Sequence, residues 1–317
     1  MKPVLIVIEE IGAFNYFYPI LRKLVSDNIE VHVHLSSILI YNNFDRNLKI
    51  FNNIHFINNL YQFDIKKFSC VVSSATGNKA ESFAIGAALK AKIPSIQFVD
   101  NIYGWKRRIT YKITTLFPNI ITVINEQCLR LAQFEGIPKN SLRVVGHPAW
   151  ESIRAIYFRK NKNTLFIGSP INQIYGNKLG YTEKEVWDMS IKASKEYPNL
   201  IKNIKYLLHK NQKKPLYIKK KYFINNVKNH SYYGQVIGVF SSYLTESYLQ
   251  GKKVVSIQPK IKRDDRWIVS NFYDEKKVIN YRQLIKNLSL NSKNKSNVRR
   301  ALNKSVFRFY ELIKAYL

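Results

Sequence analysis

The apolar positions of this chain fall into short runs that alternate with segments of helical periodicity. Residues 3–8, 68–72 and 93–99 are predominantly apolar, which is typical of strands buried on both faces of a parallel sheet. Residues 15–26 and 81–90 follow such runs with apolar side chains at helical spacing, and no hairpin signal intervenes. This repeated order of strand, turn and helix predicts a doubly wound α/β domain over residues 1–150.

A second series of the same kind begins after the polar, basic segment 149–163, a candidate hinge. Its expected strands are listed here: residues 164–167, 204–208, 235–240 and 252–257. Thr182 and Glu185 match a capping box, which predicts a helix from about residue 182. We expect a second α/β domain over residues 151–295. Residues 296–317 form a basic amphipathic helix whose apolar face either packs on the first domain or lies on a membrane.

Residues 238–259 contain the most informative turn of the chain. Ser241 and Ser242 follow an apolar run where a helix N-cap belongs, Glu246 falls in the first helical turns, and Gly251 stands where the helix ends. At the carboxyl end of a parallel strand, such a turn directs N–H groups, hydroxyls and a helix dipole at one place, which suits a phosphate. The alternative is that the serines only cap a core helix.

Charge indicates the type of partner without naming a reaction. The 51 Lys and Arg against 21 Asp and Glu leave a net charge of +30. Residues 105–112, 213–221 and 299–308 combine bases with aromatic or apolar side chains, which suits an anionic membrane surface or a nucleic-acid backbone.

The remaining composition favours a cytoplasmic protein docked on the inner face of a membrane. Cys70 and Cys128 have no metal-ligand or redox spacing and are expected to be core residues in a reducing compartment. There is no signal-peptide pattern and no apolar stretch of membrane-spanning length. His32 and His34 share a strand face, but no Cys, Asp or Glu at ligand spacing joins them, so a metal site is not expected there.

Together, the two α/β domains and these turns resemble the two-domain GT-B glycosyltransferases, in which two Rossmann-like domains face a cleft. The resemblance implies a nucleotide-sugar donor on the second domain and an acceptor on the first. The matching donor positions are Gly168, Ser169 and Pro170 in the first turn, and Ser241, Ser242 and Glu246 in the later one.

Within that superfamily, His209 and the Ser241–Ser242 pair are similar to the His-Pro and Ser-Ser motifs of bacterial sialyltransferases and capsule enzymes that use CMP-activated acidic sugars. Here Lys210 replaces the proline. Retaining members carry an earlier glutamate near this turn, where this chain has Gly238, so an inverting reaction is favoured. No metal and no cofactor are expected for catalysis, since no DxD triplet is present.

An inverting transfer needs a base beside the acceptor hydroxyl. Glu9, Glu10 and Asp100 are the candidates because each follows an expected first-domain strand, although each could equally cap a helix or form an ion pair. The acceptor side of the cleft is expected to include Ser74, Trp105, Arg107 and His147, with the alternative that His147 only marks the hinge.

The sequence therefore predicts a glycosyltransferase that extends a surface polysaccharide, capsule or lipopolysaccharide, or a lipid-linked glycan. A sugar-nucleotide 2-epimerase shares the architecture and is the first alternative, although too few carboxylates are found at strand ends. A nucleic-acid binder is suggested by charge alone, and no recognisable module for it is present.

Overall fold

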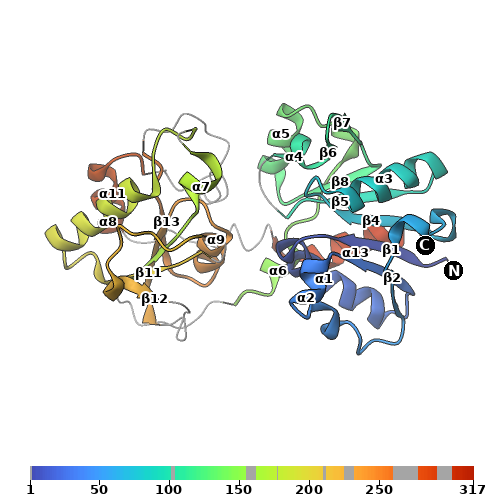
Figure 1. Ribbon diagram of the computed structural model, residues 1–317, viewed down its shortest axis with the longest axis horizontal. Coiled ribbons are helices and arrows are strands. Elements are labelled where there is room, and N and C mark those ends of the chain that lie inside the picture. The colour runs from blue at the N-terminus through green and yellow to red at the C-terminus, as the bar shows by residue number, and fades with distance from the viewer. Residues whose placement is uncertain are drawn as a thin grey trace. The chain divides into compact units, whose positions relative to one another are not determined.

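The computed structural model describes residues 2–100, 104–154, 162–176, 178–209, 212–224, 232–259, 278–290 and 302–317. The chain forms two compact units (Figure 1). The first comprises Met1–Ser152 together with Arg300–Leu317, and the second comprises Ile153–Arg299. Both are α/β units with parallel sheets, which confirms the fold class that the sequence predicts.

The first unit is built on a seven-stranded sheet whose order is β3-β2-β1-β4-β5-β8-β9, and the strands pair in parallel throughout. Its strands are β1 (Val4–Ile8), β2 (Val31–Leu35), β3 (Ile54–Phe56), β4 (Cys70–Ser74), β5 (Ser95–Phe98), β8 (Ile120–Val123) and β9 (Leu142–Val144), with a small β6 (Thr110–Tyr111) and β7 (Thr114–Thr115) hairpin. Its helices are α1 (Ile11–Ser26), α2 (Ser37–Tyr41), α3 (Lys79–Ala91), α4 (Trp105–Arg108), α5 (Glu126–Phe134), α6 (Pro148–Glu151) and α13 (Ser305–Lys314).

Alternate strand residues of the first sheet point into two different cores. Val4, Ile6 and Ile8 of β1 pack with α1 and α13, whereas Leu5 and Val7 pack with α3. Every residue of β1 is buried because helices cover both faces of the sheet. This is why continuous apolar runs, rather than alternating ones, mark these strands in the sequence.

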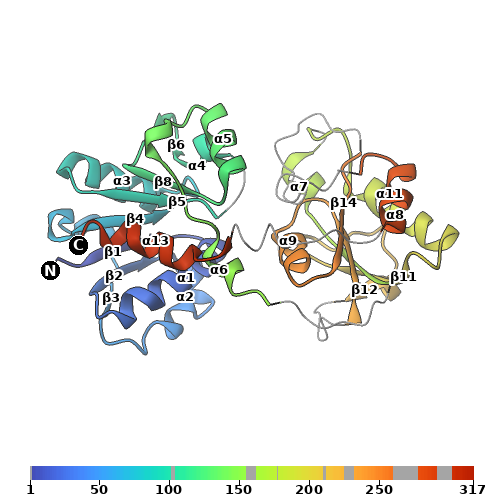
Figure 2. The same cartoon turned by 180° about the vertical axis from the view of Figure 1, so that it is seen from behind.

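The C-terminal helix α13 is part of the first unit (Figure 2). Phe309 is fully buried, with its ring 5.5 Å from that of Phe17 and 6.1 Å from that of Phe98. The carboxylate of Glu151 accepts hydrogen bonds from the N–H groups of Lys304 at 2.6 Å and Val306 at 2.9 Å. The buried face of α13 is therefore covered by protein. Of the two expectations for this tail, packing on the first unit rather than on a membrane is the one that the structure supports.

The second unit has a five-stranded parallel sheet of order β12-β11-β10-β13-β14. Its elements are β10 (Asn163–Ile167), α7 (Ile171–Tyr175), α8 (Glu183–Glu196), β11 (Lys202–Leu207), β12 (Phe223–Ile224), β13 (Gln235–Gly238), α9 (Ser242–Leu249), β14 (Lys253–Ser256) and α11 (Tyr281–Ser289). The capping box of Thr182 and Glu185 at the start of α8 is confirmed.

The structure differs from the sequence-based expectation in several places. Ser73 and Ser74, which lie beyond the expected strand 68–72, complete β4 because they pair with β5 and are fully buried. The short strand β3 and the helix α11 were not predicted.

Among the described helices, none combines the length and the apolar character required to cross a lipid bilayer.

Candidate functional site

In the first unit, candidate side chains gather where the order of strands reverses. From β1 the chain moves outward through β2 to β3 and then returns to the other side of β1 with β4. In sheets of this type, ligands bind at the carboxyl edge where the connections diverge. The segments after β1, β4 and β5 therefore form the candidate site of this unit.

Glu9, the first residue after β1, is held by neighbours on both sides. Its N–H donates to Oγ of Ser74 at 3.4 Å, and its carbonyl accepts from Oγ of Ser36 at 2.6 Å. Its Oε1 lies 3.9 Å from Nε2 of His34, whose Nδ1 donates to the carbonyl of Ile57 at 2.9 Å. Burial raises the pKa of the Glu9 carboxyl, and the nearby His34 partly offsets this. Glu9 is thus a half-buried carboxylate with a fixed backbone.

Asp100 lies at the same edge, after β5, and is engaged by a cation. Its Oδ1 is 3.7 Å from Nη1 of Arg108, which also donates to the carbonyl of Ala75 at 3.2 Å. A Cβ atom at position 12 would lie 2.8 Å from Oδ2 of Asp100, so Gly12 in the first turn of α1 leaves room for this carboxylate. Burial raises the pKa of Asp100, and Arg108 opposes that effect.

Glu10, the third candidate base, has a different environment. It is exposed and occupies the N-cap position of α1, where its carbonyl accepts from the N–H of Phe14 at 2.9 Å. Of the three carboxylates, Glu9 and Asp100 therefore combine burial with a place at the strand ends.

Ser74, expected at the acceptor side, is a buried structural residue. Its hydroxyl donates to Oε1 of Glu81, a carboxylate that is 1% exposed. Glu81 also accepts from the N–H of Thr76 at 2.8 Å, from its hydroxyl at 2.7 Å, and from the N–H of Asn78 at 3.4 Å. Burial raises the pKa of Glu81 to about 7 against these four bonds. The network fixes the turn after β4, and the spacing of Asn78 and Glu81 is the one signal that could have revealed it.

Trp105 and His147, both expected at the acceptor side, are also buried within the first unit. Trp105 is 1% exposed. His147 caps α6 by accepting the N–H of Trp150 on Nδ1 at 3.3 Å, and its ring stacks on that of Trp150 at 3.7 Å. Burial lowers the pKa of His147 to about 3, so it is neutral. Arg107, in contrast, is exposed on α4.

In the second unit, the strand order reverses between β10 and β13. The expected donor turns, which follow these two strands, therefore lie side by side at the carboxyl edge. The turn after β10 contains Gly168, Ser169 and Pro170, and the turn after β13 leads through Ser241 into α9.

The backbone of the first donor turn is already bonded within the protein. The N–H of Gly168 donates to the carbonyl of Leu207 at 2.9 Å, and that of Ser169 donates to Oε1 of Glu183 at 2.5 Å. Pro170 has no N–H to offer. The N–H groups of Gly168 and Ser169 are therefore used within the protein, and the assignment of this turn to the donor stays a prediction.

Glu183 is the centre of a buried polar network that sequence reasoning missed. It accepts from the hydroxyl of Tyr206 at 2.7 Å, from Nε2 of Gln212, and from the hydroxyl of Tyr217 at 3.5 Å. Burial raises the pKa of Glu183 to about 7. A Cβ atom at Gly168 would lie 2.5 Å from Oε1 of Gln212, so only glycine fits against this network.

The second donor turn keeps polar groups at the surface. Oγ of Ser241 caps α9 by accepting the N–H of Tyr243 at 3.3 Å. Ser242, the first residue of α9, is exposed, and its hydroxyl has no hydrogen-bond partner among the described residues. Glu246 lies one turn further along and is half-buried. The positive end of the α9 dipole and the Ser242 hydroxyl are thus both available to an anion.

His209 follows β11, the neighbour of β10, and is half-buried. Its carbonyl accepts from the N–H of Gln212 at 2.9 Å. The remaining donor candidate, Lys210, lies outside the described residues.

No family model and no characterised protein matches the chain by sequence. Solved structures do match it over nearly its whole length. UDP-GlcNAc 2-epimerase from Methanocaldococcus jannaschii, in complex with UDP-GlcNAc and UDP, has a TM-score of 0.62 and 16% identity, covering 99% of each chain. A glycosyltransferase from Arabidopsis thaliana, complexed with UDP-L-rhamnose, has a TM-score of 0.54 and 11% identity, covering 99% of this chain and 95% of the other.

The glycotransferase of kitacinnamycin has a TM-score of 0.56 and 10% identity, and the match covers 100% of each chain. At sequence identities of 10–16%, similarity to these solved structures establishes the fold alone. The chain has the two-domain α/β architecture, called GT-B, that these glycosyltransferases and epimerases share.

Proposed function

We propose that this protein is a GT-B glycosyltransferase that moves a sugar from a nucleotide-sugar donor, bound by the second unit, to an acceptor hydroxyl bound by the first. The observation that carries the proposal is the exposed start of α9. There, the helix dipole and the exposed Ser242 lie at the strand-order reversal of a doubly wound sheet. The phosphate of a nucleotide suits that position.

The reaction we propose is a single displacement. A carboxylate of the first unit accepts the proton of the acceptor hydroxyl, and the oxygen attacks the anomeric carbon. The bond between that carbon and the donor phosphate breaks, and the nucleotide leaves with both bonding electrons. The dipole of α9 and the Ser242 hydroxyl stabilise the negative charge on the departing phosphate.

Glu9 is our choice for the base. Asp100 is paired with Arg108, which occupies its carboxylate and opposes the rise in pKa that burial causes. Glu10 is exposed at a helix N-cap. Glu9 has no arginine or lysine partner among the described residues, and its backbone is fixed by Ser36 and Ser74. It therefore combines orientation with basicity.

The donor nucleotide is the less defined part of the proposal. His209 and Ser241–Ser242 support the resemblance to CMP-sugar enzymes, whereas two of the structural neighbours described above contain UDP or UDP-sugars. We therefore propose a nucleotide sugar, with CMP and UDP as the two bases to test first. Purified protein incubated with each donor should release its free nucleotide, and release should increase when the correct acceptor is added.

A sugar-nucleotide 2-epimerase is the second candidate, and the similarity to UDP-GlcNAc 2-epimerase structures favours it. An epimerase would convert the donor to its epimer without an acceptor and without loss of nucleotide. Analysis of the sugar nucleotide after incubation separates the two reactions. Epimerised sugar nucleotide in an acceptor-free mixture would overturn the transferase assignment.

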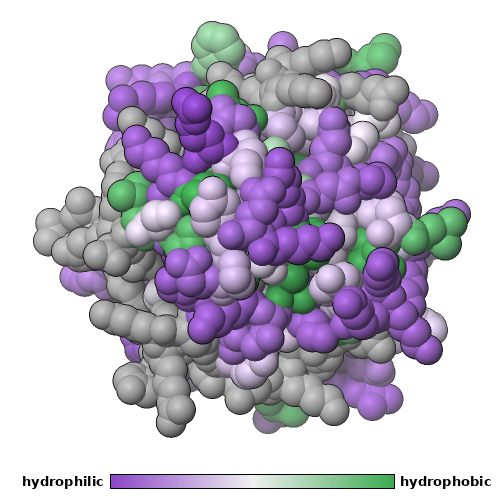
Figure 3. All heavy atoms as spheres, turned by 90° about the vertical axis from the view of Figure 1, so that its left-hand side faces the viewer, coloured by the Kyte–Doolittle hydropathy of each residue, from purple (hydrophilic) through white to green (hydrophobic). Residues whose placement is uncertain are grey.

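We further propose that the protein works at the anionic inner face of a membrane, where a lipid-linked or surface-glycan acceptor is available. In the second unit, Lys213, Lys214 and the three lysines at 219–221 are exposed, and Leu216 among them is fully exposed. Figure 3 shows a face of this unit on which hydrophilic side chains predominate and hydrophobic ones are dispersed. We expect charge-driven attachment, with about 1 kcal/mol for each lysine near the lipid.

Co-sedimentation with vesicles tests this attachment. Binding to vesicles that contain anionic phosphatidylserine should exceed binding to neutral phosphatidylcholine vesicles, and salt should weaken it. Equal binding to both vesicle types would contradict the proposal.

A further inference from the structure

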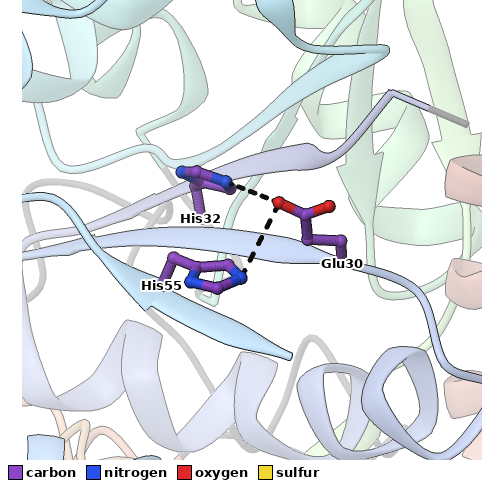
Figure 4. Close-up of side chains that lie close together, drawn as sticks. All are labelled: Glu30, His32 and His55. Carbon is purple, nitrogen blue, oxygen red and sulfur yellow. Dashed lines mark hydrogen bonds and ion pairs between the residues drawn. The ribbon is translucent and has the colours of Figure 1, made fainter. Parts of the chain in front are cut away.

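Two histidines and a glutamate from separate parts of the sequence meet on one face of the first sheet (Figure 4). His32 lies on β2 and His55 on β3, and the two are direct partners in the parallel register of these strands. Glu30 precedes His32 by two residues, so it falls on the same side of the strand. The backbone pairing therefore places the three side chains together.

The distances within this cluster are those of potential metal ligands. Oε1 of Glu30 is 3.0 Å from Nε2 of His32 and 3.7 Å from Nε2 of His55. One ligand atom from each residue lies within 4.8 Å of the others. The imidazole rings are 5.0 Å apart between centroids. Rotation of the exposed side chains would be enough to bring the three atoms around one ion.

The environment leaves access for a cation and for water. The side chains of Glu30 and His55 are each 50% exposed, whereas that of His32 is 20% exposed. The ring of His32 packs edge-on against that of Phe68 at 5.3 Å, which fixes its orientation. One anchored ligand and two accessible ones make a site that a metal can enter from solvent.

We propose that Glu30, His32 and His55 bind a divalent transition metal, and that Zn²⁺ suits them best. Two imidazole nitrogens and one carboxylate oxygen are a common zinc donor set, with a fourth, tetrahedral position left for water. The chain has a net charge of +30, which repels cations in general. Binding at this place therefore depends on the three converging ligand side chains. The ion would connect β2 to the edge strand β3.

The expected affinity is moderate because His32 lacks a supporting partner. When Nε2 binds a metal, Nδ1 must carry the proton, and metal-binding histidines usually donate that proton to an acceptor. Nδ1 of His32 is buried and has no hydrogen-bond partner within the part of the chain that the structure describes. We expect binding about 10- to 100-fold weaker than in a fully supported site, hence reversible by a chelator.

This cluster is distinct from the proposed base. His32 lies near the beginning of β2 and Glu30 directly precedes that strand, whereas Glu9 follows the end of β1, whose last residue pairs with Leu35 at the end of β2. We therefore assign the ion a stabilising role in the first unit, with no part in the transfer reaction.

Titration calorimetry of the untagged, metal-free protein with ZnCl₂ tests the inference. We expect about one bound ion per chain and a higher melting temperature with zinc. His55→Gln and Glu30→Gln should each weaken binding about tenfold or more. His209→Gln, which removes a histidine from the other unit, should bind zinc as the wild type does.

Cobalt substitution gives a second readout that does not depend on stability. Cobalt bound in a tetrahedral site should produce visible absorption in the wild type, and this absorption should be lost in His55→Gln. Absence of zinc binding, or equal binding by wild type, His55→Gln and Glu30→Gln, would overturn the inference.

Discussion

The carboxylate of Glu183 accepts a hydrogen bond from the backbone N–H of Ser169 at 2.5 Å, so a buried side chain at the start of α8 holds the turn that follows β10. Glu81 has the corresponding role in the first unit, where it accepts from the N–H and hydroxyl of Thr76 in the turn after β4. In both units a buried glutamate fixes a turn at the edge where the strand order reverses. The candidate sites are therefore built on preorganised backbone.

Removing the Glu183 carboxylate should strongly destabilise the second unit. Glu183→Ala leaves the N–H of Ser169 without its acceptor and leaves the hydroxyl of Tyr206 with Gln212 alone, and we expect a loss of about 3 kcal/mol of unfolding free energy. Glu185→Ala is the matched control two residues away, because it removes the exposed capping interaction with Thr182 at the start of the same helix. Its expected cost is about 1 kcal/mol. Urea denaturation measures both, and equal losses would refute the central position of Glu183.

The packing of α13 on the first unit makes a second prediction. Phe309→Ala should cost about 3–5 kcal/mol because the ring is fully buried among aromatic neighbours. Phe307→Ala should change stability by less than about 0.5 kcal/mol, because that ring is 54% exposed on the same helix. Thermal unfolding of the two variants distinguishes the covered face from the open one. Similar melting temperatures would mean that α13 does not pack as described.

Acidification should destabilise the first unit through His147. Its pKa is about 3 in the folded protein against an ordinary 6.5, so the unfolded chain takes up the proton more readily. The stability that this histidine contributes is complete above pH 6.5 and declines as the pH falls towards 3. Between pH 6.5 and 5 the loss is about 2 kcal/mol.

His147→Asn isolates that effect because asparagine can still cap α6 but does not titrate. The difference in unfolding free energy between wild type and variant should shrink as the pH is lowered from 7.5 to 5. A difference that is the same at both pH values would show that His147 is not buried in its neutral form.

The adjacent residues Glu9 and Glu10 provide a controlled test of the base. Glu9→Gln should lower kcat by a factor of about 10² to 10⁴ and leave the nucleotide Kd unchanged, as expected for a group that acts on the acceptor proton. Glu10→Gln should leave kcat within about twofold of the wild-type value. Release of free nucleotide from the donor, with water as acceptor, measures both rates. If Asp100→Asn lost activity and Glu9→Gln did not, Asp100 would be the base.

The sequence determined the layout of strands and helices well because burial on both sheet faces demands continuous apolar runs, as in β1. It also located the start of α8, where Thr182 and Glu185 interact locally. Contacts between distant residues were not accessible in this way. Glu183 and Tyr206 are 23 residues apart in the chain, and His55 becomes the neighbour of His32 only through strand register.

Contacts between distant elements also explain why some candidate residues are buried in the structure. Ser74, Trp105 and His147 have side-chain chemistry that suits a binding surface, but their burial depends on the packing of whole elements. Gly168 and Ser169 were assigned to the donor through the resemblance, and the sequence did not reveal that their N–H groups donate to Leu207 and Glu183. Ser242 keeps the exposure that the prediction requires.

Nucleotide binding at the start of α9 is the central claim, and titration calorimetry with CMP, UDP, GDP and dTDP tests it most directly. We predict that at least one nucleotide binds the wild type, and that Ser242→Ala weakens its affinity about tenfold by removing one hydrogen bond to a charged group. Ser289→Ala, an exposed serine at the end of α11, should bind as tightly as the wild type. Absence of binding by all four nucleotides, or undiminished binding by Ser242→Ala, would contradict the account.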